Sequence, residues 1–251
     1  MRAARTAAWL AGLVAGATAC ATAQSDPDAA QGAADAALAP PDAAPGTADA
    51  APAPPDAAPR PPDAAGPVTV TLSHSTSDAI VAGNSVSCNN STTNSHTDNS
   101  YWRVFDLPAL GVTGPFVIDQ VAFGVEEATA GSGGTQPATV RFYTLAGPLA
   151  IANLTLIGST PVSIPNQTLT IFSAPVSGIT VPAGATLAVE VFTPNGQAAG
   201  HVFFIGSNAQ PEAAPTYLSA ADCGVTEPTP TTDIGFPDMH IVLKVTGRYT
   251  P

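Results

Sequence analysis

Residues 67–251 are predicted to fold as a single antiparallel β-sandwich of jelly-roll type, and three features of the sequence support this. Short apolar segments are separated by glycine, proline, asparagine and aspartate, the residues that favour turns. Several segments alternate apolar and polar residues with a period of two, as strands with one buried face do. No segment shows convincing helical periodicity, and a domain of this length can bury a full core.

The chain begins with a short segment that has the features of a bacterial signal peptide. Arg2 and Arg5 precede an alanine-rich apolar run that is too short to span a bilayer as a permanent helix. The tetrapeptide ATAC that ends at Cys20 resembles a lipobox, in which the cysteine is acylated after cleavage. This resemblance implies a signal peptide over residues 1–19 and membrane attachment through lipid on Cys20. The predicted location is the cell envelope, as an outer-membrane lipoprotein.

A second cleavage site lies three residues further on. The tripeptide Ala-Thr-Ala that ends at Ala23 also fits a signal peptidase, and cleavage there would release a secreted protein without lipid. The sequence leaves both alternatives open.

Residues 20–66 carry the cysteine and a low-complexity segment of alanine, proline and aspartate. The triplet Asp-Ala-Ala recurs there every seven residues, at Asp28, Asp35, Asp42, Asp49, Asp56 and Asp63. A coiled coil is excluded, because Leu38 is the only large apolar residue of the repeats and proline interrupts most of them. We therefore predict a disordered tether that extends to about 130 Å in the polyproline-II conformation.

The charge and the cysteines narrow the functional classes further. The formal net charge is −12, and residues 67–251 hold four basic side chains against twelve acidic ones, which argues against nucleic-acid binding. With Cys20 assigned to lipid, Cys88 and Cys223 remain as an even pair. Such a pair in an oxidising compartment predicts a disulfide, and no Cys-x-x-Cys motif indicates a zinc site instead.

About nine segments are predicted as strands, and their alternation predicts which side chains are buried. In the segment Thr186–Thr193, the side chains of Leu187, Val189 and Val191 share the face opposite Glu190. The segment Met239–Gly247 is predicted to bury Met239, Ile241, Leu243 and Val245. The segments are Val68–Ser73, Tyr101–Leu107, Phe116–Val125, Thr139–Leu145, Asn153–Gly158, Leu169–Ala174, Thr186–Thr193, His201–Gly206 and Met239–Gly247.

Three aromatic residues are the candidates for ligand binding. Trp102, Tyr217 and Phe236 lie near predicted strand ends or loops, where an exposed ring can stack on a sugar. Trp102 also alternates out of phase with Tyr101 and Arg103, so one face of this strand is predicted to be exposed.

Acidic residues in predicted loops are candidates for a structural calcium site. Calcium takes carboxylate and carbonyl oxygens, and the candidate ligands are Glu126, Glu127, Asp222 and Asp233. The calcium-binding pattern D-x-D-x-D-G is absent from the sequence, and an acidic surface explains the same residues. No other cofactor is predicted.

No catalytic constellation is evident in the sequence. The segment around Ser132 resembles the serine region of trypsin-like proteases, but glycine replaces the aspartate expected before that serine. The four histidines show no metal-binding spacing. Asp238 and His240 share a predicted strand face, where a hydrogen-bonded pair and a solvated sheet edge are alternative interpretations.

Two long runs resemble a β-sandwich module of secreted bacterial surface proteins. They are YWRVFDLPALGVTGPFVIDQVAFGVEEATAGSGGTQPATVRFYTLAG and AVEVFTPNGQAAGHVFFIGSN, with DCGVTEP and IGFPDMHIVLKVTG further on. The resemblance covers most of Ser100–Gly247 and implies a jelly-roll-like fold, without an agreed activity or catalytic residues. The leader and tether are similar to those of bacterial lipoproteins.

Together these features predict a non-catalytic cell-surface lipoprotein that presents a β-sandwich module for binding or adhesion. A glycan or a surface protein is the expected partner. The alternatives are a structural envelope component without a ligand of its own, and a hydrolase with an unrecognised site.

Overall fold

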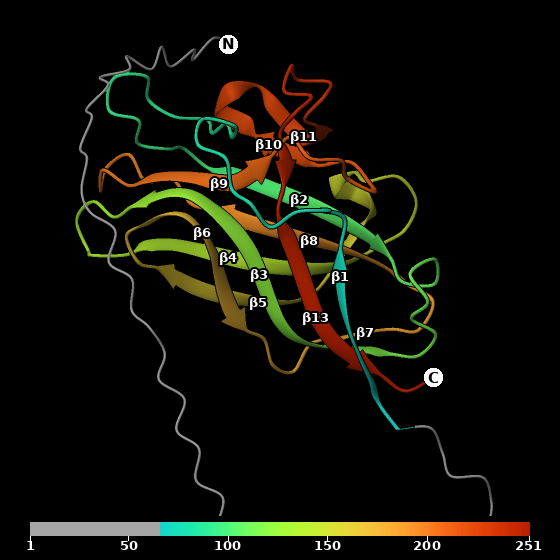
Figure 1. The fold of residues 1–251 in the computed structure, drawn as a ribbon. Coiled ribbons are helices and arrows are strands. Elements are labelled where there is room, and N and C mark those ends of the chain that lie inside the picture. Colours follow the sequence, from blue (N-terminus) through green and yellow to red (C-terminus); the bar gives the residue numbers. More distant parts are fainter. Residues whose placement is uncertain (1–65) are drawn as a thin grey trace, which may run out of the picture. The chain divides into compact units, whose positions relative to one another are not determined.

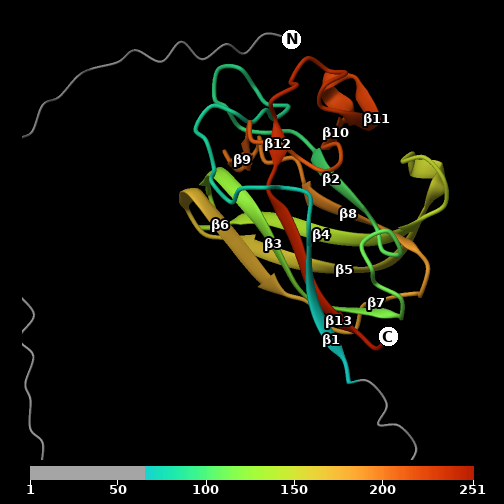
Figure 2. The same cartoon turned by 45° about the vertical axis from the view of Figure 1, so that its right-hand side comes forward.

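A computed structural model describes residues 66–251, which form two antiparallel sheets packed face to face (Figure 1, Figure 2). Within these residues the regular elements are strands and two single-turn 3-10 helices, so the predicted all-β sandwich is confirmed. No helix in residues 66–251 has the length and hydropathy needed to cross a membrane. The predicted signal peptide, the lipid on Cys20, the cleavage after Ala23 and the tether lie outside the described residues.

The first sheet is organised around its longest strand, β3. The main strand order is β1 (Val68–Ser73), β13 (Leu243–Tyr249), β3 (Phe116–Thr129), β9 (Val202–Asn208) and β12 (His240–Ile241). Two further strands, β6 (Gln167–Pro175) and β7 (Thr180–Val181), also pair with β3. With 14 residues, β3 is long enough to pair with different strands along its length.

The second sheet has six strands and carries the site described below. Its order is β11 (Val225–Pro230), β10 (Tyr217–Ala220), β2 (Asn99–Asp106), β8 (Thr186–Thr193), β4 (Gln136–Leu145) and β5 (Leu154–Ile164). One 3-10 turn, η1 (Ile151–Asn153), precedes β5, and the other, η2 (Ala221–Cys223), joins β10 to β11.

The core lies between the two sheets and follows the predicted alternation. Leu187, Val189 and Val191 of β8 are fully buried in it, as expected for alternate residues that all point inward. The four predicted core residues of the last segment are buried as well: Met239, Ile241, Leu243 and Val245.

Most predicted strands exist, and their boundaries are the main difference. The bounds of β1 and β8 match the prediction, whereas the last predicted strand divides into β12 and β13. Between them Val242 accepts a hydrogen bond from Gly124 N at 2.8 Å and donates one to Gly206 O at 3.1 Å. The strands β7, β10 and β11 were not predicted, because they are short or, in the case of VTEPTP, contain proline.

One expectation about β2 is wrong. The alternation of Trp102 with Tyr101 and Arg103 predicted an exposed face, but all three side chains are buried. Tyr101 and Arg103 point into the sandwich, and Trp102 is covered by side chains of neighbouring strands on the opposite face of the sheet. A two-residue period separates the faces of a strand but does not reveal whether neighbouring side chains cover the outer one.

The predicted disulfide between Cys88 and Cys223 is present, with the two Cα atoms 5.9 Å apart. It connects the loop before β2 to η2. Asn99 at the start of β2 adds to this link, because its side chain accepts a hydrogen bond from Cys88 N at 2.7 Å and donates one to Cys88 O at 3.1 Å.

Candidate functional site

The outer face of the six-stranded sheet gathers aromatic and charged side chains in one row across its strands. The backbone register places Trp102 of β2 opposite both Tyr217 of β10 and Glu190 of β8. Glu190 in turn lies opposite Arg141 of β4. Their neighbours along each strand point into the core, so this row points away from it.

Glu190 is the centre of this row and is almost completely buried, with its side chain 3 % exposed. Its carboxylate accepts hydrogen bonds from Ser100 Oγ at 2.5 Å and from Tyr143 Oη at 2.7 Å. Arg141 Nη1 donates to its two oxygens at 3.2 and 3.3 Å. A buried carboxylate with these partners is compensated in charge and hydrogen-bonded on both oxygens.

Arg141 lies above this carboxylate and remains partly open to solvent. Its Cζ atom is 4.1 Å from the centroid of the Phe192 ring, a cation–π contact that fixes the plane of the guanidinium. The side chain is 32 % exposed, and within residues 66–251 its hydrogen bonds use only Nη1. Nε and Nη2 have no hydrogen-bond partner among residues 66–251 and neither is a fully buried nitrogen, so this edge of the guanidinium is accessible to solvent.

Tyr143 connects the charged pair to the aromatic side chains. Burial raises the pKa of its phenol, and its hydrogen bond to Glu190 raises that pKa further. The phenol therefore stays protonated and donates to Glu190 over the physiological pH range. The Tyr143 ring lies 5.7 Å from that of Trp102, whose Nε1 donates to Ser219 Oγ at 3.0 Å.

We call this group the outer-face cluster. It consists of Ser100, Trp102, Arg141, Tyr143, Glu190, Phe192 and Tyr217. The rings of Tyr143, Phe192 and Tyr217 are half-buried, whereas Trp102 is only 4 % exposed. The half-buried rings, and not the indole, are thus the surface that a ligand can reach.

The predicted ligand-binding residues are only partly brought together by the fold. Trp102 and Tyr217 form a cross-strand pair in the outer-face cluster. Phe236 follows β11 in the chain and packs against the core between the sheets, whereas Trp102 and Tyr217 belong to the row on the outer face. The remaining members of the cluster, among them Arg141 and Phe192, were not among the candidates.

The connection between β4 and β5 borders the outer face. Ile151 N donates to Glu227 Oε2 at 2.9 Å, so this connection from β4 contacts β11. Three strands, β10, β2 and β8, lie between β4 and β11 in the sheet order. Beside the cluster, Leu156 of β5 lies opposite Tyr143 and is 55 % exposed, which adds apolar surface.

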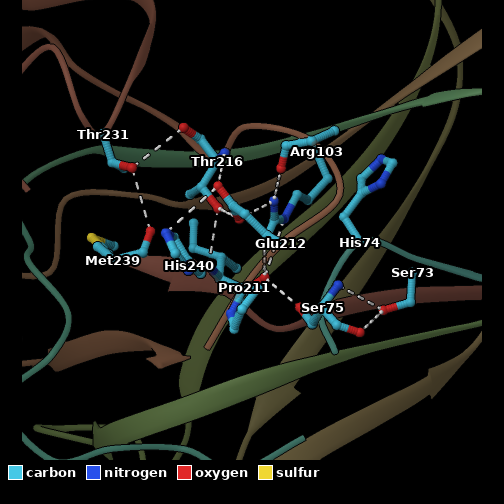
Figure 3. A network of polar contacts seen from close by, with 12 residues as sticks. Ser73, His74, Ser75, Arg103, Pro211, Glu212, Thr216, Thr231, Met239 and His240 are labelled. Atoms are coloured by element: carbon cyan, nitrogen blue, oxygen red, sulfur yellow. Dashed lines mark hydrogen bonds and ion pairs between the residues drawn. The ribbon is translucent and has the colours of Figure 1, made fainter. Parts of the chain in front are cut away.

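A second polar network lies on the inner side of the same sheet (Figure 3). Arg103 Nη1 donates to Glu212 Oε2 at 2.6 Å and to Ala214 O at 2.8 Å. Its Nε and Nη2 both donate to Ile241 O. Glu212 also accepts from Thr216 Oγ1 at 2.9 Å. Every guanidinium nitrogen thus has a protein acceptor, and the network joins β2 to the segments before β10 and around β12.

Two histidines lie at the edge of this network. The ring nitrogens of His240 lie 2.5 Å from Gln210 O and 3.0 Å from Pro237 O, so its ring is not paired with the Asp238 carboxylate. The ring of His74 stacks on Phe105. Burial lowers the pKa of His74, and nearby Arg103 lowers it further.

The calcium candidates do not gather at one place. Glu126 and Glu127 belong to β3, whereas Asp222 lies in η2 and Asp233 follows β11. The Glu126 carboxylate accepts hydrogen bonds from the backbone of Gly83 and Ser85 at 2.8 and 2.9 Å. Nowhere in residues 66–251 do three or more histidine, cysteine, aspartate or glutamate side chains form a group that fits a metal ion. Calcium binding stays a prediction.

The loop around Ser132 is explained by backbone contacts. Ser132 N donates to Ala199 O at 2.8 Å, and Gly131 N donates to His201 Nδ1 at 3.0 Å. A Cβ atom at Gly131 would lie 1.7 Å from Ala199 O, so this position requires glycine. The glycines around Ser132 therefore permit close packing of two loops.

Comparisons with known proteins leave the chain without a family. No family model and no curated protein matches it. Two solved structures match with a TM-score of 0.43 and 15 % identity over 62 % of this chain. One contains the cysteine protease and lectin-like domains of Cwp84, a surface layer associated protein of Clostridium difficile. The other is the clostridial cysteine protease Cwp84 after propeptide cleavage. The chain covers 33 % and 37 % of their lengths, and the likeness is too low to assign a function.

Proposed function

We propose that residues 67–251 are a non-catalytic binding module of the cell surface and that the outer-face cluster binds carbohydrate. In this proposal lipid on Cys20 attaches the chain to the membrane, and the tether of residues 20–66 holds the module away from it. The outer membrane is the proposed location, and calcium is a proposed structural addition.

The observation that carries the proposal is the stacked pair of Arg141 and Phe192 beside Tyr143. A sugar ring presents apolar C–H groups on its faces and hydroxyl groups around its edge. Half-buried aromatic rings match the faces, and fixed polar groups match the hydroxyls. Tyr143, Phe192 and Arg141 place both kinds of surface next to each other on strands of a rigid sheet.

The same geometry supports a positioning role for Glu190. Glycoside hydrolysis uses two carboxyl groups on either side of the scissile bond. The outer-face cluster holds a single carboxylate, and Glu190 spends both of its oxygens on Ser100, Arg141 and Tyr143. This carboxylate orients its neighbours, and a ligand contacts those neighbours.

The test is a binding screen with the full chain in a detergent that has no sugar headgroup. Binding to soluble mannan, starch, xylan, polygalacturonate and alginate is measured by affinity electrophoresis, with and without calcium. Saturable binding to at least one polysaccharide that Phe192→Ala abolishes supports the proposal. Loss of binding after calcium removal would assign calcium a role as well.

Phe172→Ala is the matched control, because Phe172 is a half-buried aromatic residue on β6 of the other sheet. This variant should bind like the wild type. Melting temperatures of both variants show whether each remains folded. If no polysaccharide binds, the carbohydrate proposal is wrong and the structural alternative gains weight. Release of reducing sugar that Asp238→Asn or His240→Gln abolishes would instead favour a hydrolase.

A further inference from the structure

The open edge of Arg141 defines what the outer-face cluster can recognise. Nη1 donates to Glu190, while the adjacent Nε and Nη2 have no hydrogen-bond partner among residues 66–251 and are not fully buried. This edge of a guanidinium offers two nearly parallel N–H donors in a rigid fork. Two acceptor oxygens on one ligand, such as those of a carboxylate or of neighbouring hydroxyl groups, match that fork.

The fork is oriented before any ligand arrives. The Phe192 ring packs against the guanidinium, and Glu190 restricts the rotation of the guanidinium by accepting two hydrogen bonds from Nη1. Both partners lie on β8, next to the strand that carries Arg141. A side chain that is already ordered loses less conformational entropy on binding, so these two donors contribute more to affinity.

The net charge of the domain favours a neutral ligand with neighbouring hydroxyl groups over a ligand with a carboxylate. The guanidinium of Arg141 is compensated by Glu190, and the other three basic side chains of residues 66–251 are also paired with carboxylates. With four basic and twelve acidic side chains, these residues have a formal charge of −8. A negative surface repels anionic ligands and leaves neutral ones unaffected.

The neighbours of Arg141 on the sheet suit a neutral ligand as well. Ser159 of β5 lies directly opposite Arg141 and is exposed, and Thr139 of β4 lies opposite Phe192. Their hydroxyl groups both donate and accept hydrogen bonds, as sugar hydroxyls do. Leu156 and the ring of Tyr143 provide apolar surface one step along the same strands.

We infer that the outer-face cluster selects neutral sugars with vicinal hydroxyl groups, to which Arg141 donates through Nε and Nη2, and that it discriminates against acidic glycans. This inference rests on the proposed function, since it names the ligand class of the same surface. Ser159 and Thr139 supply further hydrogen bonds at the rim.

The experiment compares neutral and acidic polysaccharides on the full chain and on Arg141→Lys. Mannan and starch are the neutral probes, and polygalacturonate and alginate are the acidic ones, at low salt where charge effects are largest. We expect the wild type to bind a neutral probe more tightly than either acidic one. Arg141→Lys keeps the charge but loses the fork, and should weaken neutral binding at least about tenfold.

Arg248→Lys is the matched control, because Arg248 is also paired with a carboxylate, Asp119, but lies on the other sheet. It should leave binding unchanged, and melting temperatures should show that both variants are folded. Tighter binding of polygalacturonate or alginate, or wild-type affinity in Arg141→Lys, would overturn the inference while leaving carbohydrate binding intact. If neither class of polysaccharide binds the wild type, the proposed function itself fails, and the inference fails with it.

Discussion

Residues 66–251 contain two arginine–glutamate pairs on opposite faces of the six-stranded sheet, and their burial is reversed. In the inner pair the Arg103 side chain is 0 % exposed and Glu212 is 14 % exposed. In the outer pair Arg141 is 32 % exposed and Glu190 is 3 % exposed. The same chemical pair therefore buries the cation in one region and the anion in the other.

This reversal fits a structural role for the inner pair and the proposed binding role for the outer pair. Every guanidinium nitrogen of Arg103 donates to a protein acceptor, among them the backbone oxygens of Ala214 and Ile241. Arg103 therefore connects loops to the sheet, and because its side chain is fully buried a ligand cannot reach it. In the outer pair, both oxygens of Glu190 accept hydrogen bonds from protein donors, and Arg141 reaches them through Nη1 alone. The Nε–Nη2 edge of Arg141 therefore remains available to a ligand. The partner that remains exposed is the one that can bind something else.

The largest expected effect follows from removing the buried cation. Arg103→Met should destabilise the fold by about 3–5 kcal/mol, because it leaves Glu212 without its cation and Ile241 O with Ser75 Oγ as its one remaining side-chain donor. Arg141→Met should cost less, about 1–3 kcal/mol, because Ser100 and Tyr143 still donate to Glu190 and because Arg141 is 32 % exposed, so water can reach the carboxylate once the guanidinium is removed. Urea unfolding followed by tryptophan fluorescence measures both.

The comparison also predicts that one variant loses binding and the other loses stability. Arg141→Met should lose polysaccharide binding while it stays folded, whereas Arg103→Met should bind normally at temperatures where it is still folded. Equal losses of stability in the two variants would show that burial of the arginine does not distinguish the two pairs.

A smaller effect should appear when the pH is lowered, and it arises in the inner region. His74 Nε2 lies 2.6 Å from Val104 O, while its buried Nδ1 has no partner. Because burial lowers the pKa of His74, the folded state binds fewer protons than the unfolded state just below pH 6.5. Stability is therefore full above this pH and decreases below it, by at most about 1.4 kcal/mol per pH unit for one proton.

Urea unfolding between pH 7.5 and pH 5 checks this, with His74→Phe as the variant. Phenylalanine keeps a ring against Phe105 and carries no charge, so the dependence on pH should become weaker. It should not vanish, because burial and then His96 lower the pKa of His201 with the same sign. An unchanged slope in His74→Phe would exclude His74 as a source.

The core side of this fold was predictable because burial leaves a periodic pattern. Leu187, Val189 and Val191 are separated by Ala188 and Glu190, so one strand is enough to identify their face. The pairing of Cys88 with Cys223 was predictable by elimination once Cys20 was assigned elsewhere. The buried face of β8 and the disulfide can both be inferred from the types of residue present and from residues a few positions apart in the sequence.

The outer-face cluster could not be predicted in the same way. Arg141 and Tyr143 flank the buried Phe142, so their alternation indicated an outward face but not their partners. Their contact with Glu190 depends on the register between β4 and β8, which are more than forty residues apart in the sequence. Arg103 shows the opposite difficulty, since a charged residue in phase with core residues was buried with Glu212 as its partner.

The smallest predicted effect concerns the hydroxyl group that links Tyr143 to Glu190. Tyr143→Phe keeps the ring beside Trp102 and removes one hydrogen bond, so it should cost about 1 kcal/mol at pH 7. Because the pKa of this phenol is raised in the folded state, the wild type loses stability from this group as the pH rises above about 10. The difference in unfolding free energy between wild type and variant should therefore shrink between pH 7 and pH 10.5. A constant difference would mean that the Tyr143 phenol ionises equally in the folded and unfolded states, and that its hydrogen bond to Glu190 is not maintained in solution.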